Sequence, residues 1–442
     1  KLTEKDKRGY TTSFQYDNFN RLTQETNPQG TITTYTYDSN GNRLTETVNN
    51  SRVTSYQYDE LNRTIKITRP GNVIESFTYD SNGNVKTKIN GNNQTITYTY
   101  DALDRLANKQ LTTGETSVNY TYDNWNNLTQ IIDESGTTVY VYNYNNQPTL
   151  ETKTLSGLST NSIITRTYNS ANQLSSLTDA ANRLTTYTYN SRGLLDKATY
   201  NSQDLAKYTY NSNNRVQTIT YGNNVVTNYT YDDLQRTTKI ETLSPTSTVL
   251  SKQDYQYDAE SNRITLTENN VRTTTYSYDS LNQLTTVDYS NVSNASSTSD
   301  LVFVYDSYGN RKATIGPVDS MSYAYANSNS NELTGYSYNS GKLDVALQYD
   351  GNGSVKSEAY SRLGVADKNI TYSWDSQNRL KQVQYTYNSS NNLLTTPTNT
   401  LKFTYDDNGN RTMKSSFNGL QTLDTTYYLN DGLTVLNEIN NN

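Results

Sequence analysis

The residues best suited to chemistry are aspartates that follow a tyrosine at regular intervals, often with an arginine four or five residues later. A carboxylate beside a guanidinium could act as an acid–base group beside an electrophile. Such pairs occur along the whole chain: Asp17 and Arg21, Asp38 and Arg43, Asp59 and Arg63, Asp258 and Arg263, Asp306 and Arg311, and Asp406 and Arg411. Asn190 and Asn211 replace the aspartate elsewhere, and an amide accepts hydrogen bonds but transfers no proton. We therefore expect each Asp to bind turn amides and each Arg to close over the same turn.

The tyrosines suggest ligand binding as a second possible function, because an aromatic face with a hydroxyl can stack on a sugar or another ligand. The chain has 42 Tyr, and pairs such as Tyr35 and Tyr37 recur throughout it. A binding site would place this pattern at one location. We therefore expect the rings to tile a sheet from strand to strand, with hydroxyls facing water or polar neighbours.

Several kinds of site are excluded by composition. With His 0 and Cys 0, the chain can form no disulfide, no Cys/His zinc site and no imidazole-based catalytic site. The segments 38–42 and 406–410 resemble the start of a calcium-binding loop, but the sixth and twelfth positions from Asp38 are Arg43 and Asn49 rather than Gly and Glu. We assign no catalytic, cofactor-binding or metal residues, expect no cofactor, and expect the chain not to be an enzyme.

Charge and hydropathy limit the partners. The net charge of −6 and the dispersed basic residues disfavour nucleic acid as a partner. The longest apolar run, Leu301 to Tyr305, is far shorter than the roughly 20 residues of a membrane-spanning helix. The first residue is Lys1 rather than Met, so we expect a fragment of a longer protein.

A repeat of about 21 residues organises the chain. Its marker is a Tyr followed by Asp or Asn, with Trp374 as a substituted copy: Tyr16, Tyr37, Tyr58, Tyr79, Tyr100, Tyr122, Tyr142, Tyr168, Tyr189, Tyr210, Tyr231, Tyr257, Tyr278, Tyr305, Tyr349, Trp374 and Tyr405. We expect one repeat region over residues 1–442, with regular repeats over 10–290 and irregular repeats with longer loops over 291–442.

Each repeat reads as a β-hairpin. In the segment 30–50, residues 33–37 alternate Thr and Tyr, residues 38–42 are rich in turn formers, and residues 43–47 return as a second strand. Asn and Gly in the turn tolerate left-handed backbone angles. No window shows helical spacing of apolar residues.

A single hairpin is too small to be stable, so the hairpins must stack side by side into one long sheet. Strand twist makes a sheet of more than about 30 strands curl. We therefore predict an all-β fold, a spiral of stacked antiparallel β-hairpins of about 21 residues each that forms a hollow shell or barrel.

The segment 35–45, YTYDSNGNRLT, resembles the consensus of the YD-repeat family, and similar strings recur at 276–285 and 403–412. The resemblance covers nearly the whole chain. The family includes bacterial Rhs proteins, the shell-forming components of insecticidal toxin complexes, polymorphic toxins and the teneurins. The resemblance implies a hollow β-shell, which in the bacterial members sequesters a C-terminal toxic domain and in teneurins carries cell–cell recognition.

One departure concerns the cleavage segment that follows the repeats in Rhs-type shells. That segment carries an Asp-Pro signature, and this sequence contains no Asp-Pro dipeptide. The leading expectation is a secreted, non-enzymatic shell that encapsulates a C-terminal toxin or effector of the same polypeptide. The alternative is an extracellular cell-surface adhesin or structural filament that recognises surface glycans or proteins. Neither reading involves nucleic acid or a membrane span.

Overall fold

The fold is seen in a computed structural model that describes residues 1–158, 161–291, 301–326, 331–339, 341–389, 392–393, 399–431 and 434–441. Parts of the predicted irregular region over 291–442 therefore lie outside the described residues. The described ranges contain the strands β1 to β40 and one short 3₁₀ turn, η1 (Pro70–Asn72), and within them there is no α-helix. The prediction of an all-β chain is confirmed.

The strands are short and follow each other closely in sequence. Those of the first half are β1 (Thr3–Lys5), β2 (Thr11–Tyr16), β3 (Leu22–Thr26), β4 (Ile32–Tyr37), β5 (Arg43–Val48), β6 (Arg52–Tyr58), β7 (Thr64–Arg69), β8 (Val73–Tyr79), β9 (Val85–Ile89), β10 (Thr95–Tyr100), β11 (Leu106–Gln110), β12 (Val118–Tyr122), β13 (Leu128–Asp133), β14 (Gly136–Tyr142), β15 (Pro148–Leu155), β16 (Ser162–Tyr168), β17 (Leu174–Thr178), β18 (Leu184–Tyr189), β19 (Leu195–Tyr200) and β20 (Gln203–Tyr210).

The second half continues the same succession of strands. It comprises β21 (Val216–Tyr221), β22 (Val226–Tyr231), β23 (Thr237–Leu243), β24 (Val249–Tyr257), β25 (Arg263–Glu268), β26 (Arg272–Tyr278), β27 (Leu284–Asn291), β28 (Leu301–Tyr305), β29 (Arg311–Ile315), β30 (Ser320–Tyr325), β31 (Leu333–Tyr338), β32 (Leu343–Tyr349), β33 (Val355–Arg362), β34 (Val365–Trp374), β35 (Leu380–Ser389), β36 (Asn392–Leu393), β37 (Asn399–Tyr405), β38 (Arg411–Asn418), β39 (Gln421–Asp431) and β40 (Thr434–Asn441).

Pairing runs antiparallel between neighbours in the chain. In β4 and β5, Thr36 lies opposite Thr45 and Tyr37 opposite Arg43, with a β-bulge between Thr36 and Tyr37. The same bulge recurs immediately before the marker residue in the later hairpins, as between Thr99 and Tyr100. A bulge bends the strand and increases its local twist. Each repeat therefore introduces the same bend at the same place.

The exposed Thr positions also pair across strands. Thr36 Oγ1 lies 2.6 Å from Thr45 Oγ1, and Thr209 Oγ1 lies 2.6 Å from Thr218 Oγ1. Such cross-strand hydroxyl pairs add stability on the face opposite the tyrosines. The predicted alternation, with Tyr on one face and Thr on the other, is consistent with these pairs.

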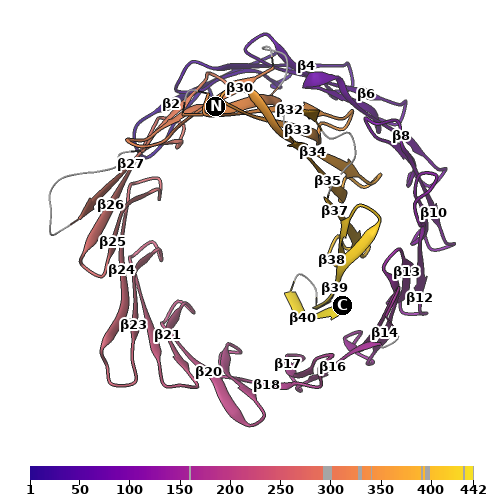
Figure 1. The fold of residues 1–442 in the computed structure, drawn as a ribbon, viewed down its shortest axis with the longest axis vertical. Helices are drawn as coiled ribbons and strands as arrows, with labels where there is room; N and C mark the ends of the chain where they lie inside the picture. The colour runs from indigo at the N-terminus through magenta and orange to yellow at the C-terminus, as the bar shows by residue number, and fades with distance from the viewer. Residues whose placement is uncertain are drawn as a thin grey trace. The chain divides into compact units, whose positions relative to one another are not determined.

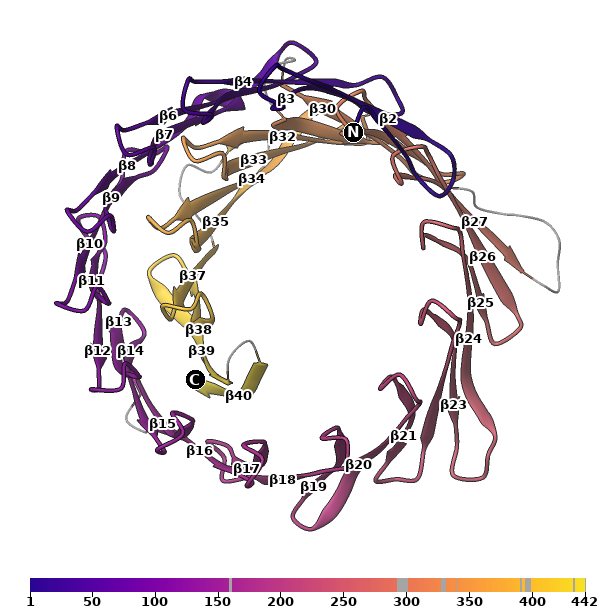
Figure 2. The same cartoon turned by 180° about the vertical axis from the view of Figure 1, so that it is seen from behind.

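The chain divides into two compact units. The first unit comprises residues 1–15, 25–31 and 166–321, and the second comprises residues 16–24, 32–165 and 322–442. Within the second unit, the late strands β34 to β38 lie alongside the early strands β8 to β14 in both views (Figures 1 and 2). Hairpins of the first unit, such as β23 and β24, follow one another in chain order in the same views.

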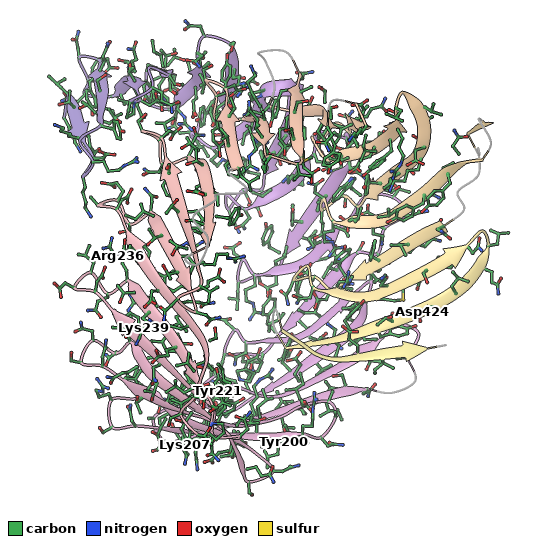
Figure 3. All side chains as sticks on the ribbon, turned by 60° about the vertical axis from the view of Figure 1, so that its left-hand side comes forward. Tyr200, Lys207, Tyr221, Arg236, Lys239 and Asp424 are labelled. Atoms are coloured by element: carbon green, nitrogen blue, oxygen red, sulfur yellow. The ribbon has the colours of Figure 1, made fainter. Side chains whose placement is uncertain are left out.

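Burial differs between the units. In the second unit Ile96, Val118 and Ile131 of early strands are buried, and Ile370, Val383 and Phe403 form a late cluster. In the described part of the first unit, the buried apolar residues are Ala198, Ala206 and Val287. The second unit is therefore the one with an apolar interior. Figure 3 draws the side chains of the described residues as sticks along the strands.

Candidate functional site

The Tyr–Asp turn is the local structure on which every repeat is built. Asp17 N–H donates to the carbonyl of Arg21 at 3.0 Å, and Asn20 N–H donates back to the carbonyl of Asp17 at 3.0 Å. The carboxylate of Asp17 then accepts the N–H groups of Phe19 and Arg21 at 2.9 and 3.0 Å. The Asp thus satisfies two turn amides that would otherwise lack a partner. The first part of the turn prediction is confirmed.

The residue three positions after the Asp has a left-handed backbone. It is Asn in many repeats, with φ of 60° at Asn62 and 69° at Asn126, and Gly in others, with φ of 91° at Gly41. Asn and Gly tolerate this conformation best. The sequence prediction of left-handed angles in this segment therefore applies to one position per turn.

Asparagine can replace the aspartate without loss of the turn. Asn190 Oδ1 accepts the N–H groups of Arg192 and Leu194 at 2.9 and 3.1 Å, and Asn211 Oδ1 accepts those of Asn213 and Arg215 at 3.0 Å. At these two turns the Asn side-chain amide oxygen takes the place of the Asp carboxylate as the hydrogen-bond acceptor. The arrangement supports the structural interpretation of the acidic position.

The marker tyrosine joins each repeat to the one before it. Tyr100 donates its hydroxyl hydrogen bond to the carbonyl of Val85 at 2.9 Å, and Tyr231 donates to that of Val216 at 2.7 Å. The acceptor is the first residue of the preceding hairpin's second strand. Trp374 preserves the same bond, because its indole N–H donates to the carbonyl of Val355 at 2.8 Å. The hydroxyl thus has a fixed backbone partner, more specific than the polar neighbours that we predicted.

Arginine four residues after the Asp closes the turn, as predicted, and also reaches the next repeat. Arg105 Nε donates to Asp101 Oδ2 at 2.7 Å, and Arg105 Nη1 donates to the carbonyl of Asp123 at 3.1 Å. Its guanidinium carbon lies 4.6 Å from the ring centre of Tyr122. Arg21, Arg236 and Arg379 make the same set of contacts. One side chain therefore bridges two successive turns.

Arginine five residues after the Asp behaves differently. At Asp38 the second carboxylate oxygen accepts from Asn42 Nδ2 at 2.8 Å, while Arg43 pairs with Glu46 at 2.9 Å and donates to Tyr56 at 3.0 Å. Asn262, Asn310 and Asn410 occupy the position of Asn42 in their repeats. The expectation that Arg43 closes over its own turn is wrong, because Arg43 is the first residue of the return strand and its side chain leaves the turn.

The charge states follow from these contacts. Hydrogen bonds from the Arg63 side chain and backbone hold the pKa of Asp59 below its usual value, and those from Asn42 do the same for Asp38. Burial raises the pKa of Tyr100 and of Tyr231. The Asp therefore stays ionised and the Tyr stays protonated at neutral pH, which suits an acceptor and a donor of fixed hydrogen bonds.

In the segment that resembles the start of a calcium loop, the Asp38 carboxylate is already bonded to groups of its own turn. Oδ1 accepts the N–H groups of Asn40 and Asn42, and Oδ2 accepts Asn42 Nδ2. In the described ranges, no three acidic side chains gather into a metal-binding group. Nor do those ranges contain a helix that could cross a bilayer.

A charged seam joins early and late repeats inside the second unit. Lys153 Nζ lies 2.9 Å from Asp406 Oδ2, with side chains only 7% and 10% exposed. Lys109 and Tyr120 both bind Asp407, whose backbone N–H donates to Asp133 at 2.8 Å. These contacts place the turn at 406–410 against the strands β11 to β15.

Glycines allow two other turns of this seam to approach closely. A Cβ on Gly91 would lie 1.8 Å from the carbonyl oxygen of Gly351, and one on Gly351 would lie 2.2 Å from that of Gly91. Asn92 Nδ2 donates to Asp350 at 2.9 Å beside this contact. Further along the seam, Ser376 N–H donates to Glu115 at 2.8 Å.

A comparable seam lies within the first unit. Gln29 Nε2 donates to Asp279 Oδ2 at 2.7 Å, and Thr31 Oγ1 donates to the carbonyl of Ser307 at 2.9 Å. The N-terminal repeats of this unit thus contact turns that follow about 250 residues later in sequence. Sequence reasoning missed both seams because the repeats resemble each other and nothing marks which copies meet.

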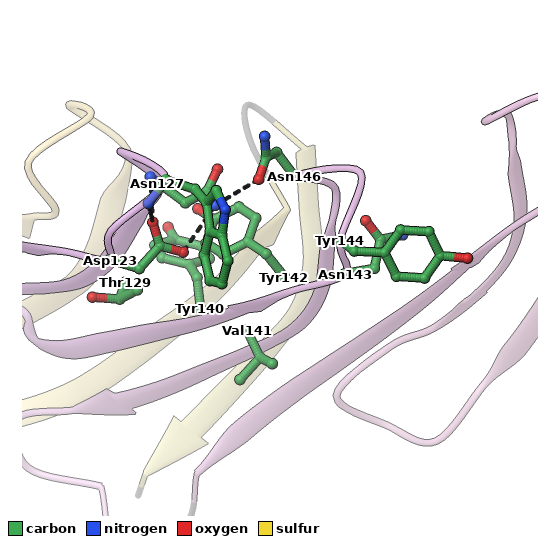
Figure 4. Close-up of a pocket in the computed structure, with 10 residues that line it drawn as sticks. Asp123, Asn127, Thr129, Tyr140, Val141, Tyr142, Asn143, Tyr144 and Asn146 are labelled. Atoms are coloured by element: carbon green, nitrogen blue, oxygen red, sulfur yellow. Dashed lines mark hydrogen bonds between the residues drawn. The ribbon is translucent and has the colours of Figure 1, made fainter.

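A pocket lies between the turns at 123–127 and 143–147 in the second unit (Figure 4). Its volume is about 450 Å³, and its lining includes Trp125, Asn127, Tyr140 and Tyr144. Sequence reasoning missed it. The available signal was that Trp125 and Tyr144 are aromatic residues outside the marker position of the repeat.

Comparison with known proteins agrees with this geometry. A family model described as Teneurin YD-shell matches residues 2–151 and 114–440. No curated protein matches the chain.

Solved structures share the fold. A Tc holotoxin pore from Photorhabdus luminescens aligns with a TM-score of 0.70 at 17% identity, over 96% of this chain and 25% of that chain. The TcdB2–TccC3 structure aligns with a TM-score of 0.61 at 15% identity, over 96% of this chain and 28% of that chain. The chain therefore spans little more than a quarter of the length of these relatives.

Proposed function

The chain belongs to the teneurin YD-shell family, and from this membership we propose that it is a non-enzymatic structural shell that encapsulates a C-terminal toxin or effector of the same polypeptide. Residues 1–442 form one repeat region of this shell. The observation that carries the proposal is the repeat itself, in which each hairpin is bonded to the last through a marker tyrosine and its backbone acceptor.

The seams support a spiral sheet. Their contacts join residues 250 apart at Gln29 and Asp279, 258 apart at Asn92 and Asp350, and 261 apart at Glu115 and Ser376. Other seam contacts join residues 247 apart at Glu134 and Lys381 and 298 apart at Lys109 and Asp407, so the turns of each unit meet copies that follow many repeats later in the chain.

The exposed surface is large for the mass of the chain. The accessible surface is 24930 Å² for a chain of 50.0 kDa. A compact monomer of that mass would expose about 17,000 Å². The excess is what a sheet with solvent on both faces would give.

Encapsulation is the role that we propose for such a shell. Such a shell would keep proteases away from its cargo, and a lumen lined by polar and Tyr side chains would offer little apolar surface for an unfolded cargo to adhere to. We place this shell outside the producing cell, as a secreted or surface-delivered protein with its effector as the main partner.

Limited proteolysis of the complete gene product tests this proposal. We expect the C-terminal domain to survive protease while the shell is folded and to be digested after the shell is unfolded in denaturant. Digestion of that domain at the same rate in both conditions, or a gene product without any domain after the repeats, would contradict encapsulation.

A second candidate function is a cell-surface adhesin or filament. The family description favours it, because the matching model is that of teneurin shells, and the YD-repeat resemblance implies cell–cell recognition for teneurins. Attachment of the purified chain to cells or to immobilised surface glycans, without any enclosed cargo, would favour this candidate over encapsulation.

A further inference from the structure

The pocket between the turns at 123–127 and 143–147 keeps the turn contacts of the repeat but carries two aromatic side chains, Trp125 and Tyr144, in its turns. In most repeats the side chain four residues after the Asp is Arg or Asn, and it reaches over to the next turn. Here Asn127 takes that role and Gln147 follows in the next turn, so that no Lys or Arg lines the pocket. The lining residues are Asp123, Trp125, Asn127, Thr129, Tyr140, Val141, Tyr142, Asn143, Tyr144 and Asn146.

Two aromatic rings of this pocket are almost wholly in solvent. The side chain of Trp125 is 75% exposed and that of Tyr144 is 96% exposed. Neither ring stands at the marker position, and neither the indole N–H nor the phenol of these residues has a hydrogen-bond partner among the described residues. In Figure 4 the Tyr144 ring lies on the side of the pocket away from Asp123 and Asn127. Large exposed rings beside a hollow are a common feature of ligand sites.

The polar groups are fixed in place by the turns. Asn127 Nδ2 donates to Asp123 Oδ2 at 2.8 Å and to Asn146 Oδ1 at 3.0 Å, which ties the two turns together. The side-chain N–H groups of Asn146 have no partner in the described part of the chain, whereas its backbone N–H donates to the carbonyl of Asn143. The site is thus preorganised, and its lining carries donors, acceptors and one carboxylate but no Lys or Arg. The adjoining Arg105 is already bonded to the Asp123 carbonyl and to Asn126 Oδ1.

We propose that this pocket binds a neutral carbohydrate of one or two pyranose rings. The Trp125 and Tyr144 rings would pack against the apolar faces of the sugar, and the Asn146 amide, the indole N–H and the phenol would bond its hydroxyls. A volume of about 450 Å³ suits a small ligand, since such sites measure roughly 300–1,000 Å³. The absence of Lys and Arg disfavours phosphate or sulfate groups. The inference does not depend on encapsulation.

Tryptophan fluorescence tests the site, because the chain has only 2 Trp. The variant Trp374→Tyr gives that repeat the residue found at the same position in the other copies and leaves Trp125 as the sole indole. We would titrate this variant with cellobiose, lactose and N,N′-diacetylchitobiose, and with a sulfated heparin disaccharide as a charged probe. We expect a saturable change in emission with at least one neutral disaccharide and none with the sulfated probe.

Matched variants in the same background then assign the response. Tyr144→Ala should weaken the affinity about tenfold or more, which equals the loss of one strong contact. Phe19→Ala is the control, because Phe19 occupies the position of Trp125 in another turn and is 80% exposed. Circular dichroism confirms that each variant is folded. No saturable response to any neutral disaccharide, a response that Tyr144→Ala leaves unchanged, or preferential binding of the sulfated probe would each overturn the proposal.

Discussion

At the residue scale, each member of the repeat has a separate physical task. The Asp carboxylate binds turn amides, the residue three positions later adopts a left-handed angle, and the Tyr hydroxyl bonds the preceding hairpin. Trp374 shows that the task at the marker position is hydrogen-bond donation from an aromatic ring, because its indole N–H replaces the phenol. None of these tasks needs an acid, a base or a nucleophile.

The hydroxyl of the marker tyrosine should contribute measurably to stability. Tyr100→Phe removes the hydroxyl that donates to the carbonyl of Val85. We expect a loss of about 1 kcal/mol in the free energy of unfolding, measured by urea denaturation. Tyr144→Phe is the control, because the Tyr144 side chain is 96% exposed, and it should change nothing. Equal effects of the two substitutions would refute the role given to the marker hydroxyl.

The pKa shifts predict that the stability of the fold stays constant over a wide range of pH. The pKa of Asp59 and Asp101 is lowered from 3.8 in the folded chain, so their contribution is complete above that value and is lost as pH falls below it. The pKa of Tyr100 and Tyr231 is raised from 10.0, so their contribution is complete below that value and is lost as pH rises above it. Thermal unfolding followed by circular dichroism should show a constant midpoint between these limits. A large change of the midpoint near neutral pH would contradict this assignment.

At the element scale, the hairpins and the seams differ in how far the sequence predicts them. The strands and turns follow from alternation and from the Asp, Asn and Gly of one repeat, as at Asp59 and Asn62. The bond from Tyr100 to Val85 escaped prediction because its acceptor is a backbone group of another repeat. The seams escaped it because Lys153 and Asp406 are 253 residues apart and resemble other Lys and Asp residues. Local chemistry determines each hairpin, whereas which repeats meet in a seam depends on how the strands bend over many repeats.

The glycine contact of the seam can be tested by a single methyl group. Gly91→Ala places a Cβ 1.8 Å from the carbonyl oxygen of Gly351, so we expect the turns at 90–94 and 350–354 to separate. Hydrogen–deuterium exchange should become faster in both turns. Gly41→Asn is the control, because Gly41 has a left-handed backbone with nothing within 4 Å, and Asn occupies the same position at Asn62. Unchanged exchange at 350–354 in Gly91→Ala would disprove the contact.

The buried ion pair of the seam should matter far more than an exposed one. Lys153→Met leaves the Asp406 carboxylate, whose side chain is 10% exposed, without its cation. We expect a cost of about 3 kcal/mol and faster hydrogen exchange in 406–410. Lys207→Met breaks the pair of Lys207 with Asp204, in which the Lys and Asp side chains are 56% and 33% exposed. This substitution should cost less than about 1 kcal/mol. Similar costs for both variants would contradict the burial of the seam.

At the scale of the whole molecule, we propose that these parts combine into one shell. Similar hairpins are bonded in series, bent by the same bulge, and bonded across the seams to turns from 247 to 298 residues away. The proposed role of a container requires in addition that such a sheet encloses space. Teneurin YD-shell membership and the shared fold of the Tc toxin structures support this claim.

Electron cryo-microscopy of the complete gene product tests that claim most directly. We expect a continuous β-sheet wall around a lumen, with weak or disordered density for the cargo inside it. A particle whose strands pack into a solid two-layer sandwich, or an open sheet with no lumen, would contradict the shell and the function proposed for it.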